Sequence, residues 1–226
     1  MRRRGAARAA AVAAVLLAAA GGFALGDAHG SGGAAPGRGA AAGGAPAARG
    51  GQTVPAADSP DAGFARDMAV HHQQAVELSY VVRDRTRDEE VRRPAYDIAQ
   101  TQANQRGMLL GWLDLWGLPK VSADPPMAWM GMGAAEPGRD GALMPGMATT
   151  AQLDRLRTAS GRQAEILYLR LMTAHHRGGV HMAGACAAAC ATPAAKRLAQ
   201  GIVTAQQSEI GAMAELLRER GAEPPA

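Results

Sequence analysis

Two stretches, Met68-Ala-Val-His-His72 and Met172-Thr-Ala-His-His176, decide the fold of this chain of 226 residues. They carry the same pattern, Met-x-x-His-His, 104 positions apart, and together they hold four of the six histidines. Flanking residues match at the same offset, in the pairs Asp61 and Glu165, Phe64 and Tyr168, Gln102 and Gln206, and Gln105 and Glu209. A spacing kept over this length predicts a duplicated structural unit.

The residues around each motif recur at helical spacing. Around the first motif they step by four and three along one face, in the series Phe64, Met68, His71, Ala75, Leu78 and Val82. The whole pattern predicts helices over Pro60–Asp88, Val91–Trp116, Thr150–Thr158, Gly161–Ala191 and Thr192–Gly221. Short connections within each long pair predict antiparallel hairpins. The expected fold class is therefore all-α: a four-helix bundle made of two duplicated helical hairpins, joined by a long Met-rich crossover connection.

The two ends of the chain differ in character from its middle. Residues 1–26 place four arginines before an apolar run, which predicts either a cleaved signal peptide or a retained N-terminal membrane anchor. Residues 27–57 hold mostly Ala, Gly and Pro, which predicts a disordered tether. We assign the bundle domain to residues 58–222, with repeat one at 58–117, the connection at 118–158 and repeat two at 159–221. The protein is expected to be secreted or otherwise extracytoplasmic, with contact to a membrane only through its N-terminal segment.

The charge pattern argues against a nucleic-acid partner. The formal net charge is +4, and the four arginines near the N-terminus account for all of it. The remaining chain is balanced, so it has no basic excess with which to bind phosphates.

The faces of the first and third long helices carry the principal candidate metal ligands, Met68, His71, His72, Met172, His175, His176 and Met182. If the repeats pack with pseudo-twofold symmetry, His71 and His175 face each other inside the bundle, each beside a methionine. His72 and His176 lie about 100° further around their helices, at the edge of this face.

This polar face has two interpretations. Methionine at core spacing is usually packing, and four buried imidazoles would then need hydrogen-bond partners such as Gln102, Gln206 and Glu209. Imidazole and thioether are also soft or borderline metal ligands, and two histidine pairs at equivalent places favour that role. The sequence thus favours a metal site over structural polar packing.

The two cysteines, Cys186 and Cys190, stand four residues apart near the end of the third long helix. Export favours a disulfide between them, whereas helix geometry favours free thiols that bind a soft metal. Both alternatives are open at this point. His181, on the same predicted helix, is a further candidate ligand.

The connection is rich in methionine, and its candidate ligands are Met127, Met130 and Met132, with Trp129 among them. Thioethers bind Cu(I) and Ag(I) with little dependence on pH, because they carry no competing proton. The alternative is that Met127 and Trp129 fold back over the end of the bundle as apolar packing.

The ligand types favour copper over iron or zinc. Di-iron bundles use Glu-x-x-His motifs, and the chain contains none. Structural zinc sites use closely spaced Cys and His sets and have no need of thioethers. Methionine with imidazole suits Cu(I) with access to Cu(II), or Ag(I). No nucleophile–base pair, phosphate loop or cofactor motif is visible, so we expect no enzyme, although a copper-dependent oxidase is a further alternative.

The repeated pattern of acid, aromatic, Met and His-His, followed by Gln-x2-Glu-Ile-x2-Met, resembles the domain-of-unknown-function 305 family over roughly residues 58–220. The match is fullest in the second half, at Met172, His175, His176, Gly178, Met182, Gln206, Glu209, Ile210 and Met213. The resemblance implies an exported, ferritin-like four-helix bundle, some members of which bind copper or silver and contribute to metal resistance.

The first repeat departs from this pattern. Leu78 stands where repeat two has Met182, and Gln105 replaces the acid at Glu209. We therefore expect either a weaker first half-site with one thioether fewer, or a single site shared by both halves.

The leading functional hypothesis is an exported protein that buffers or transfers Cu(I) or Ag(I), or confers resistance to them. Its partners would be the metal ion and other copper-handling proteins, with a homo-oligomer as a further option. The alternative is a structural or interaction module of the cell envelope, with a polar histidine core and no physiological metal.

Overall fold

The computed structural model describes residues 54–132 and 140–225. Its four long helices are α1 (Pro60–Arg85), α2 (Glu89–Trp116), α4 (Gly161–Ala189) and α5 (Pro193–Glu219). Two short helices, η1 (Ala128–Met130) and α3 (Thr150–Thr158), lie in the connection between the pairs. The fold is all-α, as predicted.

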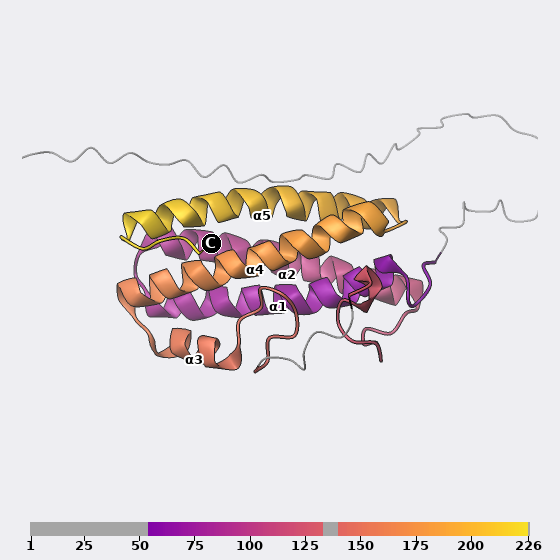
Figure 1. Ribbon diagram of the computed structural model, residues 1–226, viewed down its shortest axis with the longest axis horizontal. Helices are drawn as coiled ribbons and strands as arrows, with labels where there is room; N and C mark the ends of the chain where they lie inside the picture. The colour runs from indigo at the N-terminus through magenta and orange to yellow at the C-terminus, as the bar shows by residue number, and fades with distance from the viewer. Residues whose placement is uncertain (1–53, 133–139, 226) are drawn as a thin grey trace, which may run out of the picture. The chain divides into compact units, whose positions relative to one another are not determined.

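The long helices form two antiparallel hairpins that pack through α1 and α4 (Figure 1). Helix α1 packs against both α2 and α4, and α4 packs against α5. The short helix α3 lies against α1 and α4, and η1 lies against α1. The expected four-helix bundle of two hairpins with a long crossover is therefore what the chain forms.

Three of the long helices end earlier than the sequence pattern predicted. Helix α1 ends at Arg85 rather than at Asp88, because Thr86 is extended and Asp88 instead caps α2 by accepting a hydrogen bond from the Glu90 amide. Similarly, α4 ends at Ala189 rather than at Ala191, since Cys190 is already extended. Helix α5 ends at Glu219, two residues before the predicted end at Gly221.

An acidic residue of each hairpin forms hydrogen bonds with the turn of the other hairpin. The two acidic residues, Asp61 and Glu165, occupy equivalent positions in the repeat. Asp61, in the first turn of α1, accepts hydrogen bonds from the backbone amides of Ala191 and Thr192, both at 2.8 Å. Glu165, its equivalent on α4, accepts from the Thr86 hydroxyl and from Arg220. Buried carboxylates thus satisfy polar groups at both turns, which fixes the relative position of the hairpins.

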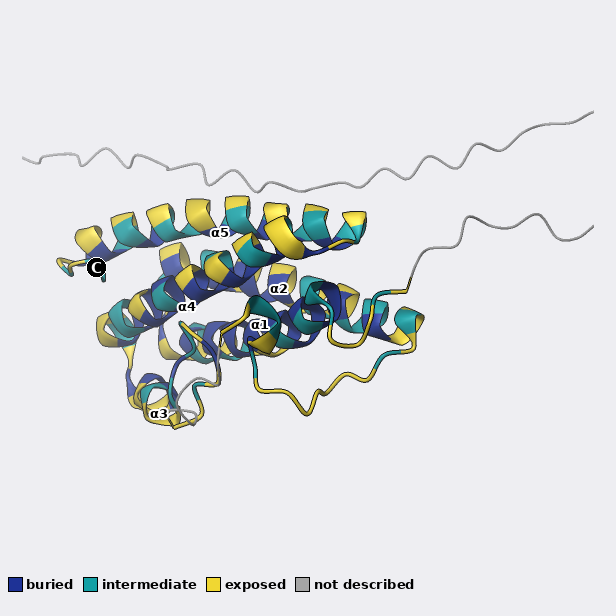
Figure 2. Cartoon of the chain, turned by 45° about the vertical axis from the view of Figure 1, so that its right-hand side comes forward, coloured by how far each residue is buried: buried dark blue, intermediate teal, exposed yellow. Residues whose placement is uncertain are grey.

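The buried positions of the long helices face the interior of the bundle, and the exposed positions face outward (Figure 2). The interior contains two apolar clusters separated by polar residues. The Phe64 cluster takes residues from the beginning of α1 and the end of α4, around Phe64, Met68, Leu109, Leu113, Met182 and Ile202. The Tyr168 cluster takes residues from the end of α1 and the beginning of α4, around Leu78, Val82, Ile98, Tyr168, Met172 and Leu217. Phe64 and Tyr168 are repeat equivalents, so each repeat supplies the aromatic residue of one cluster.

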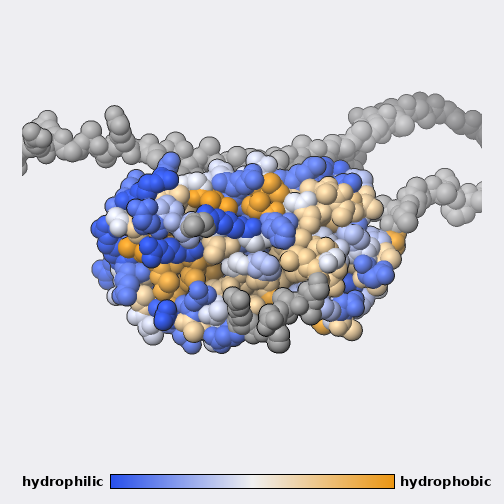
Figure 3. Space-filling model, viewed as in Figure 1, coloured by the Kyte–Doolittle hydropathy of each residue, from blue (hydrophilic) through white to orange (hydrophobic). Residues whose placement is uncertain are grey.

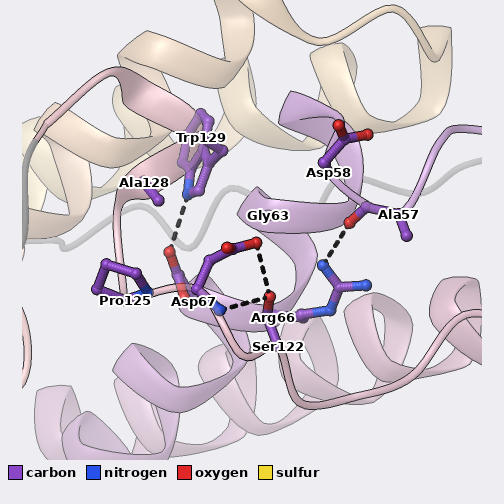
Figure 4. A pocket seen from close by; sticks show the side chains of 10 residues that line it. Ala57, Asp58, Gly63, Arg66, Asp67, Ser122, Pro125, Ala128 and Trp129 are labelled. Atoms are coloured by element: carbon purple, nitrogen blue, oxygen red, sulfur yellow. Dashed lines mark hydrogen bonds between the residues drawn. The ribbon is translucent and has the colours of Figure 1, made fainter.

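The connection is anchored on α1 through Asp67. Its carboxylate accepts a hydrogen bond from the Met127 amide at 2.8 Å. It also accepts one from the Trp129 indole at 2.9 Å (Figure 4). The indole lies over Gly63, where a Cβ would come within 2.4 Å of the ring, and it meets Phe64 edge to face. Glycine at position 63 is therefore what lets the tryptophan reach the helix.

Hydrophilic residues gather at the end of the bundle where α4 begins and α5 ends (Figure 3). None of the described helices is sufficiently long and apolar to span a membrane. The predicted signal peptide or anchor at 1–26, and the predicted tether except for residues 54–57, lie outside the described residues.

Candidate metal centre

A polar layer crosses the bundle between the two apolar clusters, with at least one residue from every long helix. Its members are His71, His72, Gln102, His175, His176 and Gln206, each of them buried. The 104-residue offset of the repeat relates the first three to the last three. The duplication therefore places equivalent polar side chains at the middle of the bundle, where the two hairpins meet.

The two central histidines of this layer lie against each other. The ring centroids of His71 and His175 are 3.8 Å apart, with the ring planes tilted by 34°. This confirms that the repeats bring His71 and His175 face to face inside the bundle.

The hydrogen bonds of three histidines define which ring nitrogen carries the proton. The Nε2 atom of His175 lies 3.0 Å from the backbone oxygen of His71, and the Nε2 atom of His71 lies 3.4 Å from the backbone oxygen of Pro145. Carbonyl oxygens only accept, so both Nε2 atoms must donate. His176 Nε2 likewise donates to Glu209 Oε2 at 2.7 Å.

The opposite nitrogen of each of these rings is left with a lone pair. The Nδ1 atoms of His71, His175 and His176 are buried and have no hydrogen-bond partner among the described residues. His72 has the Gln102 and Gln105 amides beside it, but neither of its ring nitrogens forms a hydrogen bond of normal geometry. A buried polar group without a partner lowers the stability of the folded state by about 1–3 kcal/mol, so the unpartnered atoms of this layer destabilise the metal-free fold.

Burial keeps the imidazoles of His71, His72 and His175 neutral at physiological pH. Desolvation lowers the pKa of His71 to about 4, against a weaker opposite effect of the Pro145 carbonyl. Desolvation and then the neighbouring His71 lower the pKa of His72 to about 3. The same two causes hold the pKa of His175 well below its ordinary value. A neutral imidazole is the form that binds metal, so protons do not compete strongly for these rings.

His72 and His176, which we expected at the edge of the polar face, are not at the edge of the core. Both side chains are completely buried. Helices α2 and α5 cover them with Gln102, Gln105 and Glu209, which the helical angle within α1 or α4 alone could not reveal.

The methionines lie on both sides of the layer rather than in repeat-specific half-sites. Because α1 and α4 are antiparallel, Met68 and Met182 fall in the same apolar cluster, the Phe64 cluster, whereas Met172 falls in the Tyr168 cluster. Repeat one has Leu78 where repeat two has Met182. Because Met182 packs in the same cluster as Met68, the Phe64 cluster holds two of these three methionines and the Tyr168 cluster holds one. All three methionine side chains are fully buried.

The connection closes one side of the layer through residues that the sequence analysis did not single out. Gln74 donates to the Ala148 oxygen at 2.9 Å and accepts from the Ala148 amide at 2.6 Å. The Pro145 backbone lies so close to α4 that a Cβ at Gly178 would come within 2.0 Å of its oxygen. The pair Gly178-Gly179 in the middle of a helix was the available signal, because glycine there indicates a close approach.

The other candidates lie away from the layer. Cys186 and Cys190 form a disulfide in the Phe64 cluster, so the free-thiol alternative is not what the structure shows. Met127 is buried in that cluster and Trp129 packs against it, as the fold-back alternative predicted. Met130 packs against the same cluster. Met132 is 41% exposed, and His181 is exposed on α4. The structure brings none of these six candidate ligands into the polar layer.

The donor set suits an ion that needs few ligands. Within residues 54–132 and 140–225, no three or more His, Cys, Asp or Glu side chains are grouped so as to hold a metal ion. Closed zinc sites and di-iron sites require such groups. Buried imidazole lone pairs with thioethers on either side instead fit a soft monovalent ion, which accepts low coordination numbers.

Comparison with known proteins agrees with this fold. The family model described as a domain of unknown function, DUF305, matches residues 61–217. A DUF305 protein from Streptomyces coelicolor that is inferred to be secreted is 67% identical, with a TM-score of 0.70 over 76% of this chain and 99% of that chain. A DUF305 fragment from Deinococcus radiodurans is 32% identical, with a TM-score of 0.58 over 71% of this chain and 96% of that chain.

CopM in its Cu(II)-bound form shares the fold at lower identity. It is 24% identical, with a TM-score of 0.56 over 71% of this chain and 97% of that chain. No curated protein sequence matches the chain. On the family model and the two closely similar structures, the chain belongs to the DUF305 family.

Proposed function

We propose that this protein is an exported metal-binding protein that holds Cu(I) or Ag(I) in its polar layer, for buffering, transfer or resistance, without catalytic turnover. The observation that carries the proposal is the set of three buried Nδ1 atoms, on His71, His175 and His176, that have lone pairs and no partner among the described residues. Metal ions bound at these atoms would satisfy them and offset the free energy lost by burying them unpaired.

Two further observations support the choice of metal and the location. Met68, Met172 and Met182 supply buried thioethers in the two apolar clusters that flank the layer, and thioether with imidazole favours Cu(I) and Ag(I). CopM, which shares this fold, is known in Cu(II)-bound, Cu(I)-bound and Ag-bound forms. The similar Streptomyces coelicolor protein, inferred to be secreted, supports export, and other extracytoplasmic copper-handling proteins are the partners that such a role implies.

The test compares metal affinity with stability in one variant. Replacing His71 and His175 with leucine removes two unpartnered Nδ1 atoms while keeping a similar volume, so the metal-free variant should be as stable as the parent or more stable. Its affinity for Cu(I) and Ag(I), measured against a competing chelator, should fall by at least about tenfold, which corresponds to about 1.4 kcal/mol.

The matched control is His181→Leu, which changes a histidine of the same helix outside the layer. It should leave the affinity unchanged. Undiminished affinity in the His71/His175 double variant would contradict the proposed site. Absence of binding by the parent protein would contradict the proposed function and favour a cell-envelope structural or interaction module.

A further inference from the structure

The polar layer approaches the surface at two places that the repeat makes equivalent. Gln105 on α2 and Glu209 on α5 are both partly exposed, unlike the six buried side chains of the layer. Gln105 lies beside His72, and Glu209 lies beside His176. Each half of the layer therefore ends in one side chain that meets both a histidine and solvent.

Glu209 and Gln105, the side chains at the two ends of the layer, differ in charge and in hydrogen-bonding capacity. The Glu209 carboxylate, 34% exposed, lies 2.7 Å from His176 Nε2, and it is the one carboxylate paired with a histidine among the described residues. A carboxylate only accepts, so it holds the proton on Nε2 and leaves the lone pair on Nδ1. The Gln105 amide can donate or accept, so it accommodates either tautomer of His72.

The two halves of the layer also differ in how well they can compensate the charge of a bound metal ion. Burying a cation is costly unless an opposite charge compensates it. One monovalent ion beside His176 would be balanced by the single negative charge of Glu209. The same ion beside His72 would leave a net positive charge, because Gln105 is neutral.

We infer that Glu209 is a positioning residue that ranks the two halves of the polar layer, so that the His175–His176 half takes the first monovalent soft cation and the His71–His72 half takes a second one more weakly. The inference rests on the proposed function. A carboxylate bonded to the far nitrogen of a ligating histidine fixes the ring and strengthens its donor nitrogen, typically by about 10–100-fold in metal affinity.

Reciprocal substitutions between the repeats test this ranking. Glu209→Gln gives both ends an amide, Gln105→Glu gives both a carboxylate, and the double variant moves the carboxylate to repeat one. Gln and Glu have nearly the same shape and both sites are partly exposed, so the fold should persist in all three. The probe is Ag(I), titrated into the purified metal-free protein against a competing chelator. Long-range ¹H–¹⁵N NMR of the histidine rings follows each equivalent added.

In the parent, His176 should be the Nε2–H tautomer, and the first equivalent of Ag(I) should perturb the rings of repeat two. Glu209→Gln should mix the His176 tautomers and weaken the first equivalent by about 10–100-fold. The double variant should transfer the first equivalent to His72. A purely structural role of Glu209 would change neither the tautomer nor the order of filling.

Two failures are distinguishable. Tight Ag(I) binding by the parent, with the same affinity and order of filling in Glu209→Gln, would overturn the ranking and leave the proposed function standing. Absence of Ag(I) binding by the parent would overturn both.

Discussion

His175 donates a hydrogen bond from Nε2 to the backbone oxygen of His71 at 3.0 Å, while the two rings lie 3.8 Å apart. This bond joins the two repeats at their centre. It also determines the chemistry of the layer, because a proton held on Nε2 leaves Nδ1 of His175 as a buried lone pair.

Acid should destabilise the metal-free protein. Burial lowers the pKa of His71 to about 4 and that of His72 to about 3, whereas the unfolded chain titrates near the ordinary histidine value of about 6.5. Below that value the unfolded state binds protons that the folded state excludes, so stability falls as the pH falls. Each such histidine should contribute about 1.4 kcal/mol per pH unit at full effect.

Urea unfolding between pH 7 and pH 5 measures this slope. The His71→Leu variant should show a smaller slope, because one histidine no longer titrates on unfolding. An equal slope in parent and variant would show that His71 does not contribute.

Removal of the Asp61 carboxylate should loosen the turn between α4 and α5. Asp61→Ala leaves the amides of Ala191 and Thr192 without their acceptor, and we expect a loss of about 3 kcal/mol in the free energy of unfolding. Asp61→Asn keeps one acceptor oxygen and should lose less. Chemical denaturation measures all of these, with exposed Asp58→Ala as the control, expected within about 0.5 kcal/mol of the parent. Equal losses of unfolding free energy at positions 58 and 61 would contradict the proposed role of Asp61 in holding this turn.

Two glycines of α4 should respond oppositely to alanine. Gly178→Ala places a Cβ within 2.0 Å of the Pro145 backbone oxygen, whereas a Cβ at Gly184 has no neighbour within 4 Å. The first substitution should destabilise the protein by about 1–3 kcal/mol, and the second should stabilise it by about 0.5–1 kcal/mol through helix propensity.

The substitutions Gly178→Ala and Gly184→Ala also test whether the connection shields the polar layer from solvent. Displacing Pro145 removes the acceptor of His71 Nε2, so Gly178→Ala should make a buried histidine reactive to diethyl pyrocarbonate. Gly184→Ala should react like the parent. Stabilisation by both substitutions would mean that Pro145 does not lie against α4.

Loss of the disulfide should affect stability and not metal binding. It closes a loop of only four positions, so replacing Cys186 and Cys190 with alanine should lower the free energy of unfolding by at most about 2 kcal/mol. Neither sulfur lies in the polar layer, so the Ag(I) affinity should equal that of the parent. A large fall in affinity would indicate that these sulfurs are ligands.

The spacing of the two motifs was enough to predict the helices, the hairpins and the meeting of His71 with His175. That succeeds because helical periodicity assigns residues to faces, and duplication implies that the faces are equivalent. Gln102, Gln206 and Glu209 were candidate partners from the sequence, but only the tertiary structure decided which groups cover each histidine. Burial of His72 and His176 depends on α2 and α5, and the closure of His71 depends on Pro145, which is 74 residues away. The antiparallel pairing of α1 and α4 likewise decided that Met68 shares a cluster with Met182. Periodicity within one helix carries no information about the neighbour that packs on it, whereas the protons, partners and charges of a buried site are set by those neighbours.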